Sequence, residues 1–159
     1  MVQFIVLALF AATAAAGPPE GYRFLPFDQA MQSARDTGKR LFLYVGRQGC
    51  PTCEQTNRES FTDPAVQKAY SDHYVLAYVD SEGGRRLTLL SGERVTEMDL
   101  NARLGVVGTP TFFLLEPDAT PILKRPGFQS AADFLLYDRF VREGHYRSQS
   151  FAQFRDSLR

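Results

Sequence analysis

The residues best suited to chemistry are two cysteines, Cys50 and Cys53, in the motif Cys-Pro-Thr-Cys. They are the only cysteines among the 159 residues. A disulfide between them would close so short a loop that it would remove little entropy from the unfolded chain. Small exported domains that depend on disulfides for stability usually have several cysteines spread along the chain. The pair is therefore expected to react rather than to stabilise the fold.

The residues around Cys50 predict a reactive thiol. Gly49 precedes it and Pro51 follows it, and proline is favoured at the first position of a helix, where its missing N–H costs nothing. A thiolate at a helix start faces unpaired backbone N–H groups and the positive end of the helix dipole, which lower the pKa of the thiol. We expect the Cys50 thiolate to attack a partner disulfide. Cys53, one turn later, would then attack Cys50 and release the reduced partner.

Other uses of a Cys-x-x-Cys pair fit these residues less well. Attachment of a c-type haem needs histidine directly after the second cysteine, where this sequence has Glu54. A tetrahedral zinc site needs about two further ligands, and His73 and His145, both expected at the surface, have no spacing that would recruit them. A two-thiolate site for Cu(I) is an alternative use of the pair. Thiol exchange is favoured because a helix start tunes nucleophilicity, and it calls for no metal and no cofactor.

A strand must carry the chain to Cys50, and the apolar run Leu41-Phe-Leu-Tyr-Val45 predicts one that is buried on both faces of a sheet. Apolar periodicity and turn residues predict the other elements: strands over 74–80, 111–115 and 120–124, a hairpin over 86–96, a short helix capped by Asp63, and helices over 27–37, 51–60, 97–104, 130–141 and 150–158. Helices and strands that alternate and then end in adjacent strands predict one α/β domain. Its mixed central sheet would have helices on both faces, with a small hairpin inserted before the third helix.

The first residues are expected to lie outside this domain. Residues 2–10 are apolar apart from Gln3, and a run of small residues ending at Ala16 follows. This pattern predicts a secretory signal peptide over residues 1–16, cleaved near Ala16, before a domain over residues 17–159. It is too short for a comfortable transmembrane span. An uncleaved anchor and a disordered apolar start are the alternatives.

The composition is that of an ordinary globular protein, with 44% hydrophobic and 23% charged residues. The 18 basic and 18 acidic residues give a formal net charge of zero at neutral pH. Because no basic cluster stands out, binding to nucleic acid or to an anionic membrane surface has no electrostatic support.

On these residues the sequence resembles the thioredoxin superfamily over residues 22–143. The resemblance rests on Cys50-Pro-Thr-Cys53 at a strand-to-helix turn and on Gly108-Thr-Pro-Thr-Phe112 before a later strand. It implies a thioredoxin fold in which a cis peptide bond precedes Pro110 and this proline lies against the cysteine pair. It also implies that Thr109 offers backbone hydrogen bonds to the partner peptide, so that Thr109 and Pro110 bind the substrate.

Two positions depart from the family's pattern. Tyr44 occupies the place of a buried aspartate on the strand before the motif, and Gly49 replaces an aromatic residue. Since that aspartate is the family's usual candidate for deprotonating the second cysteine, the resemblance gives no base for Cys53. Glu54 is adjacent in sequence, but neighbouring positions on a helix point in different directions. A solvated acid in the first helical turn is the simpler interpretation of Glu54.

More narrowly, the sequence is similar to SoxW-type periplasmic thioredoxins. The shared features are Phe61-Thr-Asp-Pro-Ala-Val66, the hairpin before the helix at Glu97, and Gly127-Phe128 before the last long helix. This similarity implies a periplasmic protein that passes electrons from a membrane thiol donor to the disulfides of partner proteins, in a setting of sulfur oxidation. Two alternatives use the same cysteines: a disulfide-forming oxidase, and a chaperone that binds copper or thiol proteins without turnover.

Overall fold

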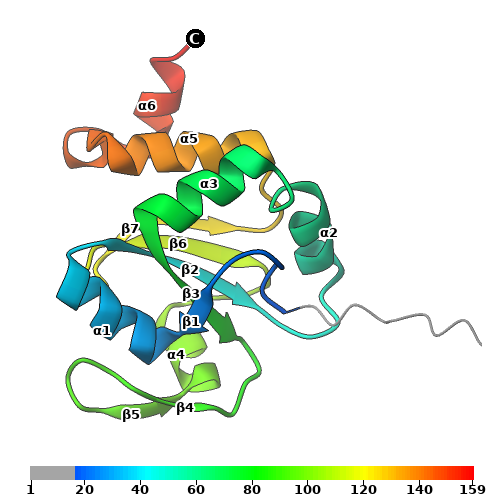
Figure 1. Cartoon of the computed structure of the whole chain (residues 1–159), viewed down its shortest axis with the longest axis vertical. Coiled ribbons are helices and arrows are strands. Elements are labelled where there is room, and N and C mark those ends of the chain that lie inside the picture. Colours follow the sequence, from blue (N-terminus) through cyan, green and yellow to red (C-terminus); the bar gives the residue numbers. More distant parts are fainter. Residues whose placement is uncertain (1–16) are drawn as a thin grey trace, which may run out of the picture.

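A five-stranded mixed sheet forms the centre of the computed structural model, which describes residues 17–159 (Figure 1). The strand order is β1-β3-β2-β6-β7, with β1 (Phe24–Pro26), β2 (Arg40–Gly46), β3 (Tyr74–Asp80), β6 (Thr111–Leu115) and β7 (Pro121–Pro126). Strands β1, β3 and β2 are parallel, and β6 runs antiparallel to both β2 and β7. The predicted mixed sheet is confirmed. The predicted signal peptide over residues 1–16 lies outside the described residues.

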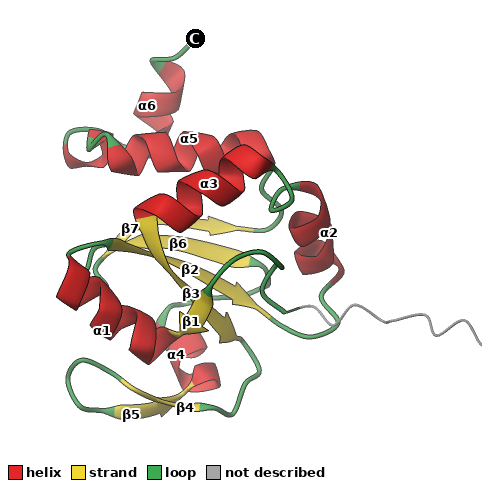
Figure 2. Cartoon of the chain, viewed as in Figure 1, coloured by secondary structure: helices red, strands yellow, loops and turns green. Residues whose placement is uncertain are grey.

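Helices cover both faces of this sheet (Figure 2). They are α1 (Phe27–Thr37), α2 (Pro51–Glu59), α3 (Pro64–His73), α4 (Glu97–Arg103), α5 (Ala131–Arg142), α6 (Phe151–Asp156) and a 3-10 turn (His145–Arg147). On one face lie α1, α4 and the hairpin of β4 (Arg86–Thr88) and β5 (Arg94–Thr96); on the other lie α3 and α5. None of the described helices has the length and apolar character of a membrane span.

Strand β2 shows why both faces of the central sheet are covered by helices. Phe42 and Tyr44 belong to the core cluster beneath α3 and α5. Leu41, Leu43 and Val45, which alternate with them, belong to the cluster beneath α1. All five side chains are at most 1% exposed. A strand that is apolar on both faces needs a layer on each side, so β2 lies at the centre of the sheet and leads directly to the cysteine motif.

The elements predicted from the sequence agree with the structure to within two residues at their ends. The hairpin lies directly before the helix at Glu97, as predicted; this helix is α4 because the short helix capped by Asp63 is counted as α3. Asp63 caps α3 by accepting hydrogen bonds from two backbone N–H groups, and Pro64 could not continue a preceding helix. Strand β1 and the 3-10 turn were not predicted. Strand β1 is three residues long and ends in a proline, so only its pairing with β3 defines it.

The chain after α5 packs back onto that helix through aromatic rings. Phe154 of α6 is 1% exposed. Its ring centroid lies 5.3 Å from that of Phe140 on α5 and 4.5 Å from that of His145 in the 3-10 turn. Arg125 of β7 lies 4.3 Å above the ring of Phe151. Helix α6 therefore shares the core of the domain.

The hairpin is attached to the sheet through the first turn of α4. Glu97 is only 4% exposed, and its N–H donates to the Arg85 carbonyl at 3.0 Å. The N–H of Met98 donates to the Gly83 carbonyl at 3.1 Å. Burial raises the pKa of the Glu97 carboxyl, although Arg85 and a hydrogen bond from the Asp80 backbone favour its charged form. A buried carboxylate thus lies where the chain leaves β3 for the hairpin.

Replacing Phe154 by alanine is expected to lower the free energy of unfolding by about 3 kcal/mol, because the change leaves a cavity in place of a buried aromatic ring. Guanidinium denaturation of the oxidised protein measures this change. Leu158, which is 44% exposed on the same segment, provides the control: Leu158→Ala should change stability by less than about 0.5 kcal/mol. Equally small effects of both substitutions would show that α6 does not unfold cooperatively with the domain.

Glu97 gives the stability a pH dependence of definite sign. Because its pKa is raised in the folded state, the folded protein binds the proton more tightly than the unfolded chain does. The free energy of unfolding therefore falls as the pH rises from the ordinary glutamate pKa through the raised one. Glu97→Gln removes this loss, so the variant should gain stability relative to wild type across that window. Thermal unfolding at a series of pH values measures the difference.

Glu93 provides the matched control for this measurement. Its exposed carboxylate accepts hydrogen bonds from Arg103, which lower its pKa. Its contribution to stability is present above the ordinary glutamate pKa and is lost as the pH falls. Glu93→Gln should therefore lose stability relative to wild type as the pH rises. A change of the same sign in both variants would contradict the role assigned to burial at Glu97.

Candidate active site

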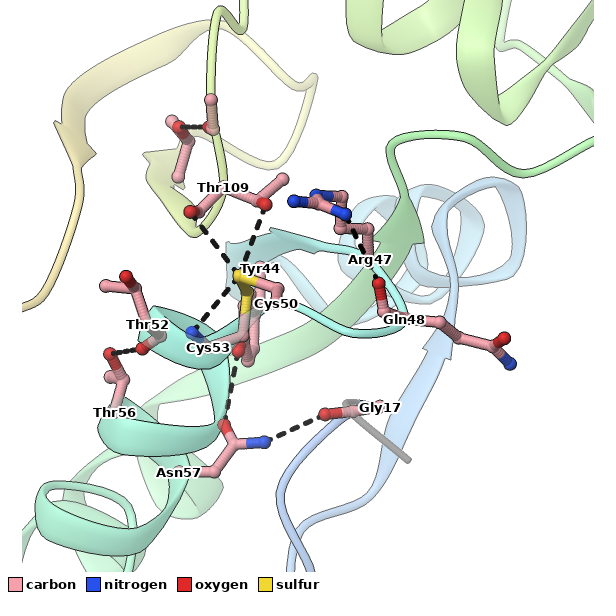
Figure 3. Close-up of a disulfide and its surroundings, with 12 residues drawn as sticks. Gly17, Tyr44, Arg47, Gln48, Cys50, Thr52, Cys53, Thr56, Asn57 and Thr109 are labelled. Carbon is pink, nitrogen blue, oxygen red and sulfur yellow. Dashed lines mark hydrogen bonds between the residues drawn. A yellow bond between two sulfur atoms is a disulfide. The ribbon is translucent and has the colours of Figure 1, made fainter. Parts of the chain in front are cut away.

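Cys50 and Cys53 form a disulfide where β2 passes into α2 (Figure 3). Their Cα atoms are 5.2 Å apart. Gly49 makes the turn before the helix with a φ of +62°, a conformation that costs other L-residues roughly 1 kcal/mol. Pro51 then opens α2, with Cys50 as its N-cap. The strand-to-helix position and the bonding reach predicted for the pair are confirmed.

The sulfur of Cys50 accepts two hydrogen bonds. The backbone N–H of Cys53 donates to it at 3.2 Å, and the hydroxyl of Thr109 donates at 3.3 Å. The carbonyl oxygen of Thr109 also lies 3.4 Å from this sulfur. That approach is a contact in the disulfide, which has no S–H, and it provides an acceptor for the thiol proton after reduction. Because both donors point at one sulfur, they would stabilise a thiolate on Cys50.

The loop before β6 brings Thr109 to the disulfide from a distant part of the chain (Figure 3). The Thr109–Pro110 peptide bond is cis, as the resemblance implies. The carbonyl of Pro110 accepts a hydrogen bond from the N–H of Gly127 at 2.8 Å, so the segment after β7 borders the same loop. Val107 is fully exposed and Phe128 is 38% exposed, which gives these two segments an apolar surface. The binding of a partner peptide by Thr109 and Pro110 stays a prediction.

Tyr44 lies fully buried on β2, at the position where the resemblance implies an aspartate. Its hydroxyl donates to the side-chain oxygen of Asn57 at 3.2 Å, and Asn57 donates to the Gly17 carbonyl at 2.9 Å (Figure 3). Burial raises the pKa of Tyr44, so this hydroxyl stays neutral at physiological pH and does not supply a base for Cys53.

Asn57 also belongs to the site, although the sequence did not predict a role for it. It lies four positions after Cys53, so the two share one face of α2. Through Tyr44 it joins the helix of the cysteines to the central strand. The i, i+4 spacing was the available signal, but an asparagine on a short helix resembles a solvated surface residue until its strand partner is known.

The two histidines lie away from the cysteines. His73 ends α3, and its ring nitrogen lies 2.9 Å from the Asp138 carboxylate. The next residue along the chain pairs with Arg40 at the start of β2, which is the end of the strand opposite to the disulfide. The His145 ring stacks on α6 at the C-terminal side of the fold. In residues 17–159, no group of three or more histidine, cysteine, aspartate and glutamate side chains is arranged to hold a metal ion.

Comparison with solved structures confirms the thioredoxin fold. A thioredoxin-fold protein from Helicobacter pylori superposes with a TM-score of 0.66 at 18% identity, covering 77% of this chain and 88% of that one. A putative disulphide-isomerase from Bacteroides thetaiotaomicron gives 0.62 at 22% identity, covering 83% and 97%. A thioredoxin from Thermus thermophilus gives 0.61 at 28% identity, covering 76% and 86%.

Sequence comparisons agree with the fold. An uncharacterized protein of Caenorhabditis elegans is 34% identical over 94 residues, which make up 59% of this chain. The chain spans only 12% of the length of that relative. A profile of the thioredoxin-like domain matches residues 27–141, from the start of α1 into α5. The chain therefore belongs to the thioredoxin-like domain family, and its two cysteines form the Cys50–Cys53 disulfide.

Proposed function

We propose that this chain is an exported thiol–disulfide oxidoreductase that reduces disulfides of partner proteins, with Cys50 as the nucleophile and Cys53 as the resolving thiol. The observation that carries the proposal is the pair of hydrogen bonds donated to the Cys50 sulfur by the Cys53 N–H and the Thr109 hydroxyl. Both bonds support negative charge on this sulfur, and a stabilised thiolate is the form that attacks a disulfide.

The proposed reaction transfers two electrons and two protons. The Cys50 thiolate attacks one sulfur of the partner disulfide, so that a mixed disulfide forms while the partner's own S–S bond breaks and its leaving sulfur takes up a proton. Cys53 then loses its proton to solvent and attacks the Cys50 sulfur. The Cys50–Cys53 disulfide forms and the second partner sulfur leaves, to be protonated. A dithiol donor must reduce this disulfide before the next turnover.

The reducing direction is supported by the residues between the cysteines. Pro51 and Thr52 add no positive charge there, and a strong oxidant needs a strongly stabilised reduced form. The likeness to the T. thermophilus thioredoxin, at 28% identity, favours the same direction. The similarity to SoxW-type proteins and the apolar segment over residues 2–10 support the rest of the proposal: a periplasmic location, a membrane thiol donor and a setting of sulfur oxidation.

The pKa of Cys50 in the reduced protein is expected to lie below the value of about 8.5 for a free thiol. Thr109→Val, which removes one donor, should raise that pKa by about 1. The pH dependence of alkylation by iodoacetamide measures both values. Thr62→Val is the control, because the Thr62 hydroxyl donates to the carbonyl of Arg58 and not to sulfur. A Cys50 pKa at or above that of a free thiol would contradict the proposed nucleophile.

Cys53→Ser is expected to trap the partner protein, because the mixed disulfide on Cys50 can no longer be resolved. Expression of this variant in the native compartment, followed by non-reducing electrophoresis and mass spectrometry, identifies the protein captured. Cys50→Ser is the control and should capture nothing while losing all insulin reduction. Equal capture by both variants would contradict the assigned roles.

The reduction potential of the pair decides between the two redox directions. Equilibration with glutathione should give a value towards about −270 mV for a reductant, whereas a value towards about −120 mV would show an oxidant. Wild-type protein that binds thiol proteins or Cu(I) without reducing any disulfide would instead indicate a chaperone.

A further inference from the structure

A cleft of about 210 Å³ adjoins the disulfide on the side of Thr109. Thr109 belongs to both features, since its hydroxyl also donates to the Cys50 sulfur at 3.3 Å. The cleft is further lined by Val107, which is fully exposed, and by the charged residues Arg47 and Glu82. A polypeptide that brings a disulfide sulfur to Cys50 therefore has its neighbouring side chains within reach of this cleft.

Arg47 presents a positive charge that no acid of the described chain neutralises. It forms none of the ion pairs found within residues 17–159. Among the described residues its side chain makes a single hydrogen bond, a long one of 3.5 Å to the carbonyl of the adjacent Gln48. In Figure 3 the guanidinium group lies next to the Thr109 side chain. An arginine in this state can bind a carboxylate through two parallel N–H donors.

The order of strands shows how the segments that carry the two charges are arranged along the edge of the sheet. Arg47 directly follows β2, Glu82 follows β3 on one side, and Thr109 precedes β6 on the other. The N–H of Ser81 donates to the Gly46 carbonyl at 2.8 Å, so the turn that carries Glu82 runs along the end of β2. Because the strand order is β3-β2-β6, the segment that carries Arg47 lies between the loop of Thr109 and the turn of Glu82 along this edge of the sheet.

Asn101 contributes a polar side chain to the wall of the cleft. It lines the cleft from α4, and its side-chain oxygen is buried without a hydrogen-bond partner among the described residues. A buried acceptor that has no donor is costly to the folded state.

We infer that this cleft binds the residues next to the reacting cysteine of the partner protein and selects an acidic side chain there, through Arg47. The inference rests on the proposed reduction of partner disulfides. The occupant is a polypeptide with aspartate or glutamate beside its half-cystine. Glu82 repels an acidic side chain of the partner and attracts a basic one. The charges of Arg47 and Glu82 should therefore have opposite effects on the preference for an acidic partner.

The size of the preference follows from the exposure of the cleft. Solvent-exposed ion pairs contribute little. Attraction for an acid and repulsion of a base together predict roughly a three- to tenfold difference in rate between an acidic and a basic peptide at low salt. The difference should shrink at high salt because mobile ions screen exposed charges.

Single-turnover reduction of synthetic peptides tests the inference. Three short peptides, identical except for aspartate, asparagine or lysine beside their one cysteine, each carry a fluorescent thiol in disulfide linkage. Stopped-flow mixing with the pre-reduced full chain gives a second-order rate constant for release of the dye. We expect the order aspartate, asparagine, lysine. Arg47→Gln should reduce the aspartate-to-lysine ratio to about one, and Glu82→Gln should increase it.

Arg58→Gln is the matched control. Arg58 lies on α2, is 68% exposed and pairs with Glu59, so its substitution makes the same change in net charge outside the cleft and should leave the ratio as in wild type. Equal rates for the three wild-type peptides, or an unchanged ratio in Arg47→Gln, would overturn the inference and leave the proposed function intact. Failure to release dye from any peptide would overturn the proposed function, and this inference with it.

Discussion

The sulfur of Cys50 is both the reactive atom of the proposed chemistry and the N-cap acceptor of α2. It accepts the hydrogen bond of the Cys53 N–H that a serine or an aspartate would accept at the start of another helix. This hydrogen bond holds the sulfur at the N-terminus of the helix, where a thiolate is stabilised. Strand β2, buried on both faces, fixes the point from which the turn at Gly49 begins. The central sheet thus determines the position of one sulfur atom.

The second cysteine has a different environment. Cys53 is 1% exposed within a core cluster rich in aromatic rings, in which Tyr44 stacks on Phe61 at 5.8 Å and lies 4.8 Å from Phe112. A buried aspartate at position 44 would need a partner for its charge. Tyrosine fills this space with its ring, and its hydroxyl donates a hydrogen bond to the side-chain oxygen of Asn57. With tyrosine at position 44, this part of the described core holds no buried carboxylate beside the cysteine pair.

Most of the fold could be predicted from the sequence because its signals are local. Caps such as Asp63 and the capping box at Thr96, where Asp99 completes the reciprocal bond, define helix starts within a few residues. The disulfide could be predicted for the same reason. Strand β1 could not, because three residues ending in Pro26 give no periodic pattern.

The cleft beside the disulfide was also beyond prediction from the sequence. Arg47, Glu82 and Asn101 come from three separate segments that only the strand order brings together. Arg47 by itself resembles any solvated arginine. Nothing in its neighbourhood along the chain indicates that it lines a cleft with Thr109, or that it forms no ion pair within residues 17–159.

The hydrogen bond from Asn57 to the Gly17 carbonyl bears on where a surface or a fused protein can be coupled to this chain. The described chain enters the fold against the helix that carries both cysteines, whereas it ends beyond α5 and α6, away from α2 (Figure 1). A surface or a reporter protein coupled after Arg159 would leave the disulfide open to large partners. The same cargo coupled just before Gly17 would lie beside α2, so the choice of terminus sets how near the cargo is to the helix of the cysteines.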